Sequence, residues 1–98
     1  MKRYIGRLGT YIEIDGEDIT LYSLPANTER CVLDEIKSVN IWEAAGKNPG
    51  RMTILTEHTL HNMEFDAAQN DDFIECYRQL IAKIDPYISR TYKSVRKI

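Results

Sequence analysis

The chain has 98 residues, of which 43% are apolar and 29% charged, and its formal net charge is −2. This length is enough for one domain with its own core, and the composition excludes a disordered tail and a disulfide-rich secreted scaffold. The sequence contains no apolar run of about eighteen residues that could cross a membrane, and no N-terminal apolar run, so we expect no signal peptide. We therefore expect a single cytoplasmic domain spanning residues 1–98.

The first part of the chain predicts four short strands. Alternating residues around 4–8 indicate the first strand, which contains a glycine bend. Residues 10–14 and 18–23 form the clearest hairpin, because Gly16 between them supplies the positive φ that a tight turn requires. A fourth strand is expected over residues 30–33.

The next part predicts three further strands. Residues 36–44 alternate between apolar and polar side chains and lead into a loop at residues 47–50. Residues 51–56 and 59–67 make a last hairpin. Each joint carries turn residues, and neither an internal repeat nor a Gly/Ser-rich linker interrupts the series. Seven strands result.

A helix is predicted over residues 70–84, NDDFIECYRQLIAKI, with Asn70 as its N-cap. Its apolar residues recur at steps of four, three and four, so one face must be buried. A helix that follows antiparallel strands most simply covers the open side or end of their curled sheet. The residues expected to be buried together are Val39, Ile41, Ile54, Phe65, Phe73, Tyr77 and Leu80.

The segment after Pro86 continues the apolar stripe of this helix. Ile88, Tyr92 and Val95 follow one another at steps of four and three. We therefore predict a helix that is kinked at Pro86 and extends over residues 86–98. One end of a small sheet domain is too short to bury so long a stripe, which favours a homodimer formed through this extension.

The order of these elements is similar to that of a known family. The IDGEDITLY hairpin, the LDEIKSVNIW strand, the RMTILT and LHNMEFDA pair and the closing NDDFIECYRQLI helix cover nearly the whole chain. In this order the chain resembles the small bacterial pleckstrin-homology-like (PH-like) domains of largely unknown function. The resemblance implies a mainly β, α+β fold: a partly open, seven-stranded antiparallel barrel of two near-orthogonal sheets, capped by one C-terminal helix.

The sequence shows no pattern typical of catalysis or metal binding. His58 and His61 are three positions apart, and on a strand such residues point to opposite faces, so we predict no metal site. Paired carboxylates coincide with turns or with the helix start, and no glycine-rich phosphate loop is present. Cys31 and Cys76 are expected to be reduced, partly buried thiols. We therefore expect a protein without enzymatic activity or cofactor.

The charge is distributed unevenly along the chain. Residues 13–85 contain all fifteen acidic residues but only six basic ones. The other basic residues lie near the two ends: Lys2, Arg3, Arg7, Arg90, Lys93, Arg96 and Lys97. If the two ends lie together, this basic pole favours anionic partners or head-to-tail self-association.

Two functions of different classes follow from these patterns. The one we favour is a protein-interaction or self-assembly module that contacts its partner through surface aromatic residues and the apolar stripe. Its candidate residues are Trp42, Tyr22, Tyr92, Ile88 and Val95. The alternative is the binding of an anionic surface, either a membrane lipid headgroup or a nucleic acid, through the basic ends. Its candidate residues are Arg90, Lys93, Arg96 and Lys97.

Overall fold

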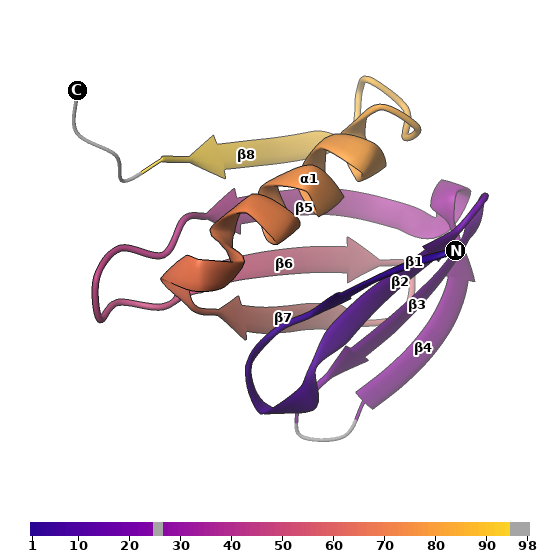
Figure 1. The fold of residues 1–98 in the computed structure, drawn as a ribbon. Coiled ribbons are helices and arrows are strands. Elements are labelled where there is room, and N and C mark those ends of the chain that lie inside the picture. Colours follow the sequence, from indigo (N-terminus) through magenta and orange to yellow (C-terminus); the bar gives the residue numbers. More distant parts are fainter. Residues whose placement is uncertain (25–26, 95–98) are drawn as a thin grey trace.

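The structure, a computed structural model, describes residues 1–24 and 27–94 (Figure 1). These residues form eight strands: β1 (Lys2–Ile5), β2 (Tyr11–Asp15), β3 (Asp18–Ser23), β4 (Asn27–Val32), β5 (Ile36–Trp42), β6 (Gly50–Thr56), β7 (Leu60–Phe65) and β8 (Ser89–Lys93). They also form one α-helix, α1 (Asn70–Ile81), and three short 3-10 helices: η1 (Arg7–Gly9), η2 (Leu33–Glu35) and η3 (Ala67–Gln69). No helix in the described part of the chain is long and apolar enough to span a membrane.

The strands form two four-stranded sheets. β1 to β4 make the first sheet as an antiparallel meander in chain order. The second sheet has the order β7-β6-β5-β8, in which β8 runs parallel to β5 and the other pairs are antiparallel. The strands of the first sheet cross those of the second obliquely (Figure 1). The sequence prediction of a mainly β fold with one helix towards the C-terminus is therefore confirmed.

Alternating apolar side chains from both sheets form the core. In the first hairpin, Ile12 pairs with Leu21 and Ile14 with Ile19, and all four residues are buried. The turn that joins these strands contains Gly16 at a φ of 63°, as the Asp-Gly pattern predicts. All seven residues predicted for the core are buried: Val39, Ile41, Ile54, Phe65, Phe73, Tyr77 and Leu80.

Helix α1 packs mainly against β5 of the second sheet and β1 of the first, and so closes one end of the core. On its buried face the ring of Phe73 stacks on that of Phe65, with 4.4 Å between the ring centroids. The N-cap role expected of Asn70 is wrong, because Gln69 is the N-cap residue. The Asn70 side chain binds the backbone of Ala44 instead: Oδ1 accepts from the N–H at 2.8 Å and Nδ2 donates to the carbonyl at 2.9 Å. This amide therefore ties the start of the helix to the segment after β5.

The helical extension expected over residues 86–98 is wrong for the part that the structure describes. Helix α1 ends at Ile81, and residues 89–93 form β8 beside β5. The described strands are therefore eight in number, not seven, and they are not all antiparallel. A parallel strand can join the sheet here because α1 supplies the crossover that such a connection needs.

The residues around Pro86 explain why the helix does not continue. The carboxylate of Asp85 accepts a hydrogen bond from Tyr87 N at 2.8 Å, and the Asp85 carbonyl accepts one from Ile88 N at 3.0 Å. The guanidinium of Arg90 donates to the Asp85 carbonyl at 2.7 Å and to a carbonyl of the last helical turn. Pro86 has no N–H to offer a helix. The edge of β5 then provides backbone hydrogen bonds for the following residues. The chain therefore forms a strand here, although the spacing of its apolar side chains also fits a helix.

Candidate functional site

One face of the second sheet is turned away from the core. On β5, Val39 and Ile41 are buried, so Asn40 and Trp42 point to the opposite side. The strand register continues this alternation across β6 and β7. We call the surface formed by these side chains the outer face; its residues are Asn40, Trp42, Arg51, Thr53, Leu55, Leu60, Asn62 and Glu64.

Three large apolar side chains are exposed on the outer face. Leu55 and Leu60 lie opposite each other on β6 and β7, and they are 39% and 53% exposed. Trp42 is 37% exposed and lies opposite Arg51. An exposed tryptophan beside an arginine is typical of the centre of a protein interface, and the leucine pair adds apolar area to the same surface.

Two shallow hollows border the outer face. One, of about 240 Å³, is lined by Trp42, Pro49, Arg51 and Glu64. The other, of about 290 Å³, lies between the outer face and the β1–β2 connection and is lined by Arg7, Leu8, Thr10, Leu24, Arg51, Asn62 and Glu64. Arg51 and Glu64 belong to both hollows and form an ion pair at 4.0 Å. Each hollow therefore combines apolar walls with the same pair of opposite charges.

Leu8 stands out at the rim of the second hollow. Its backbone has a φ of 57°, in the left-handed region that disfavours residues with a Cβ, and its side chain is 78% exposed. Holding a leucine in this conformation costs on the order of 1 kcal/mol. The fold thus keeps an apolar side chain in water on a strained backbone, at a cost that core packing does not explain. This combination favours a role in contact with another molecule.

The structure places the two aromatic candidates of the body on different sheets. Trp42 lies on the outer face, as described above. Tyr22 lies on β3 in the first sheet, where its ring stacks on Tyr11 with 5.7 Å between the centroids. The sequence therefore identified one residue of the outer face, and it did not predict that Leu55, Leu60 and Arg51 share the surface with Trp42.

The chain itself covers part of the apolar stripe expected in the C-terminal extension. Ile88 packs against the core, and the ring of Tyr92 meets that of Tyr77 edge-on with 5.7 Å between the centroids. The Tyr92 hydroxyl donates a hydrogen bond to the buried carboxylate of Glu43. Ile88 is thus partly covered by its own chain, whereas Tyr92 remains 38% exposed on β8. That a second copy covers this stripe stays a prediction. Val95 lies outside the described residues.

Several basic residues near the ends form contacts within the chain. The three near the N-terminus form ion pairs: Lys2 with Glu75 at 3.6 Å, Arg3 with Glu13 at 2.8 Å and Arg7 with Asp66 at 3.4 Å. Arg90 binds backbone carbonyls at the end of α1, whereas Lys93 is exposed on β8. Arg96 and Lys97 lie outside the described residues. Much of the expected basic pole is thus neutralised or engaged locally.

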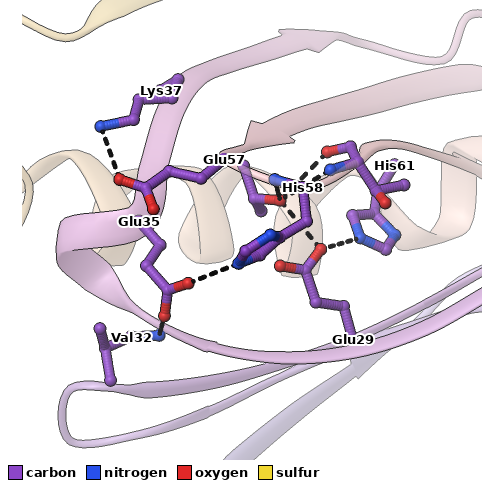
Figure 2. Close-up of polar contacts among 9 residues, drawn as sticks. Glu29, Val32, Glu35, Lys37, Glu57, His58 and His61 are labelled. Carbon is purple, nitrogen blue, oxygen red and sulfur yellow. Dashed lines mark hydrogen bonds and ion pairs between the residues drawn. The ribbon is translucent and has the colours of Figure 1, made fainter.

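A cluster of histidine and glutamate side chains connects the two sheets (Figure 2). Oε1 of Glu29, on β4, accepts a hydrogen bond from Thr56 Oγ1 at 2.9 Å and is hydrogen-bonded to His61 Nε2 at 2.8 Å. Its other oxygen, Oε2, is buried and receives no hydrogen bond from any residue in the described part of the chain. Leaving such an oxygen without a partner costs about 1–3 kcal/mol, and more if the group is charged. A cation at Oε2 would remove this cost.

His61 continues the network into the core. Its ring bridges two side chains: Nε2 lies 2.8 Å from Glu29 Oε1, and Nδ1 lies 2.8 Å from Ser23 Oγ. Ser23, His61 and Glu29 therefore stand in the order of a nucleophilic triad. However, Ser23 is only 1% exposed, and its hydroxyl is closed to a substrate. The network instead satisfies polar groups that the fold has buried.

The exposed side of the cluster consists of Glu35, from η2, and His58, from the β6–β7 turn. His58 Nε2 lies 3.0 Å from Glu35 Oε2, and Val32 N donates to Glu35 Oε1 at 3.0 Å. These hydrogen bonds, the Val32 N–H first, lower the pKa of Glu35, so its carboxyl is ionised near neutral pH. One ligand atom from each of Glu29, Glu35 and His58 lies within 4.8 Å of the others.

Local sequence patterns do not reveal this cluster, because its members come from β4, η2 and the β6–β7 turn. The prediction that His58 and His61 face different ways agrees with the structure, in which His61 is fully buried and His58 is exposed. One feature of the sequence indicates that His61 is buried. It occupies an inward position of the strand alternation that also contains Met63 and Phe65. A histidine in such a position needs a buried hydrogen-bond partner, and Glu29 provides it.

Both cysteines are buried free thiols, as the sequence predicted. Burial raises the pKa of Cys31 to about 11, and the negative charges of Glu29 and Glu35 contribute to the rise. Burial also raises the pKa of Cys76. Both thiols are therefore protonated near neutral pH, when a thiol is a poor nucleophile and a poor metal ligand.

Comparisons of the chain with protein-family models, with curated proteins and with solved structures found no significant match. The resemblance to PH-like domains thus rests on the order of the elements and on their hydrophobic pattern. The function has to be argued from the outer face and from the histidine and glutamate cluster.

Proposed function

We propose that the chain is a non-enzymatic protein-interaction module that self-assembles through the outer face. The observation that carries this proposal is the exposure of Trp42, Leu55 and Leu60 together on one sheet face that α1 does not cover. The row of Asn40, Thr53 and Asn62 separates Trp42 from the leucine pair. Large apolar side chains on one sheet surface favour burial against another protein, because their removal from water stabilises the complex by roughly 25 cal/mol per Å².

We further propose that the fold is a variant of the PH-like domain. An antiparallel meander of four strands, a second meander of three strands and a following helix support this assignment, since they occur in the order that the resemblance implies. The variation is β8, which joins the second sheet beside β5. Domains of this size commonly serve as scaffolds whose function lies in their surface.

A second copy of the chain is the partner that the charges of the outer face favour. Arg51 and Arg7 lie beside Glu64 and Asp66, so both signs of charge occur along the edge of the apolar surface. A surface with both signs can oppose itself across a two-fold axis, which is the commonest symmetry of homo-oligomers. We therefore place the homodimer interface on the outer face and not on the segment after Pro86.

Binding of an anionic surface through the basic ends is the second-ranked proposal. The ion pairs of Lys2, Arg3 and Arg7 and the backbone contacts of Arg90 reduce the positive charge available for such a surface. Added salt separates the two functions. Anion binding weakens steeply as salt screens the charges, whereas association through apolar side chains persists.

The single tryptophan of the chain provides a direct probe of self-assembly. We expect the quenching of Trp42 fluorescence by acrylamide to decrease as the protein concentration rises through the micromolar range, because the indole becomes covered. In Leu60→Asp, which places a charge on the outer face, quenching should stay high at all concentrations. Tyr87→Ser is the matched control, since Tyr87 is 96% exposed and not part of the outer face. Quenching of the intact chain that does not change with concentration would contradict self-assembly.

A further inference from the structure

We propose that Glu29, Glu35 and His58 form a binding site for a divalent transition-metal ion of the zinc type. The three side chains offer two carboxylate oxygens and one imidazole nitrogen, all within 4.8 Å of one another. Imidazole nitrogen favours Zn²⁺ and related ions over Mg²⁺ and Ca²⁺, and carboxylates complete such sites. None of the three residues belongs to the outer face, and the inference does not depend on the proposed self-assembly.

The three ligands need only small shifts to hold the ion. Tetrahedral Zn²⁺ with ligands at 2.0–2.1 Å places those ligands about 3.4 Å apart. His58 Nε2 and Glu35 Oε2 are already 3.0 Å apart. Their side chains are 64% and 27% exposed, so both can adjust without disturbing the core. The exposed side of the site leaves room for water as a fourth ligand.

Glu29 is the fixed ligand of the proposed site. Its side chain is 11% exposed, and its Oε1 is held by His61 and Thr56. The remaining oxygen, Oε2, is buried and accepts no hydrogen bond from the residues that the structure describes. An ion at Oε2 would give that oxygen its partner. Hydrogen bonds to the second oxygen of a ligating carboxylate are the usual means by which proteins orient such ligands.

The backbone already holds the contributing segments together. Glu57 N, in the β6–β7 turn, donates to the carbonyl of Glu35 in η2 at 3.0 Å. In the same turn, His58 N donates to Thr56 Oγ1 at 3.1 Å, and Thr56 Oγ1 in turn binds Glu29. A bound ion would therefore join β4 of the first sheet to the β6–β7 turn of the second. Because the unfolded chain lacks this arrangement, binding should raise the melting temperature.

The test is calorimetric titration of the intact chain with ZnCl₂, together with thermal melts at increasing Zn²⁺. We expect one ion per chain, with at least tenfold weaker binding in His58→Ala and in Glu35→Gln. Glu57→Gln is the matched control, because Glu57 lies next to His58 but pairs with Lys37 at 3.2 Å and belongs to no part of the site. This variant should bind Zn²⁺ as the intact chain does.

Two further measurements identify the ligands. Cys31→Ser should bind Zn²⁺ normally, and the Co²⁺-loaded protein should show no sulfur-to-cobalt charge-transfer band, because no thiolate takes part. The metal-free variants are first compared by circular dichroism and melting, and the exposed positions of His58 and Glu35 keep these two variants folded. Absence of one-to-one binding in the intact chain, or equal affinity in His58→Ala and Glu35→Gln, would overturn the site. Loss of binding in Cys31→Ser would overturn the assigned ligands.

Discussion

At the scale of single residues, the polar and the apolar groups of the interior contribute to the stability of the fold in different ways. Phe73 and Phe65 are fully buried, and their rings stack on each other. Glu29 is mostly buried but carries a carboxylate, of which one oxygen is held by His61 and Thr56. Replacement of a core aromatic ring should therefore lower the free energy of unfolding, because it leaves a cavity. The contribution of Glu29 to stability depends instead on whether its second oxygen has a partner.

The first residue-scale prediction concerns the core. Phe73→Ala should lower the free energy of unfolding by about 3–5 kcal/mol, because it removes a fully buried ring and leaves a cavity against Phe65. Gln79→Ala, on the exposed face of α1, should change it by less than about 0.5 kcal/mol. Urea unfolding of the three proteins measures both effects. Equal stability of the two variants would mean that α1 does not close the core.

The second residue-scale prediction concerns alkaline pH. The pKa of Cys31 is about 11 in the folded chain, raised from 9.0 by burial first. The unfolded chain therefore loses this proton at lower pH than the folded chain, and stability should fall as pH rises from about 9 to 11. Below about pH 9 the free-energy difference between the intact chain and Cys31→Ser should be constant. Above it, the intact chain should lose stability relative to the variant.

Urea unfolding at several pH values between 8 and 11 measures this difference. The comparison between the two proteins cancels the titration of the other groups, including Cys76. A free-energy difference that is independent of pH throughout this range would show that the Cys31 thiol is as free to ionise in the folded chain as in the unfolded chain.

Single residues of the core were predictable, and those of the polar cluster were not. Phe65 and Phe73 belong to local patterns, the two-residue period of a strand and the helical period, and each pattern indicates the buried side by itself. Glu29 and His58 have no local pattern in common. They meet because β4 and the β6–β7 turn approach each other in the folded chain, which depends on how the two sheets pack.

At the scale of elements, the formation of β8 determines which side chains after α1 pack against the core. Ile88 packs against the core just before β8 begins, whereas its neighbour Tyr87 is 96% exposed. Ile88→Ala should therefore lower the free energy of unfolding by about 1–3 kcal/mol, and Tyr87→Ala should leave it nearly unchanged. Denaturant unfolding at low protein concentration gives both values. An effect of Ile88→Ala that grows with protein concentration would instead place Ile88 in an interface between chains.

The elements differ in how well the sequence specifies them. The hairpin around Gly16 was predicted because the turn and the alternation on both sides are local signals. The strand β8 was mistaken for a helix because Ile88 and Tyr92 also fit a helical spacing. Residues 89–93 form a strand because they pair with β5, which lies far away in the sequence, so no local pattern could predict this pairing.

At the scale of the whole molecule, α1 covers one side of the second sheet and leaves the other side as the outer face. The sequence predicted a sheet domain closed by a helix but placed the association surface on the C-terminal stripe. Folding instead packs Ile88 partly against its own core and exposes Trp42, Leu55 and Leu60 on one sheet face. The alternation within each strand indicates which residues point outward, but only the order and register of β5, β6 and β7 bring them onto one surface.

The central claim, self-assembly through the outer face, is tested most directly by sedimentation velocity over a series of protein concentrations. The intact chain and Tyr87→Ser should sediment as dimers at micromolar concentration, and Leu60→Asp should sediment as a monomer with an unchanged circular dichroism spectrum. Added salt should leave the dimer in place. A monomeric intact chain throughout the series, or a Leu60→Asp variant that is as dimeric as the intact chain, would contradict the claim.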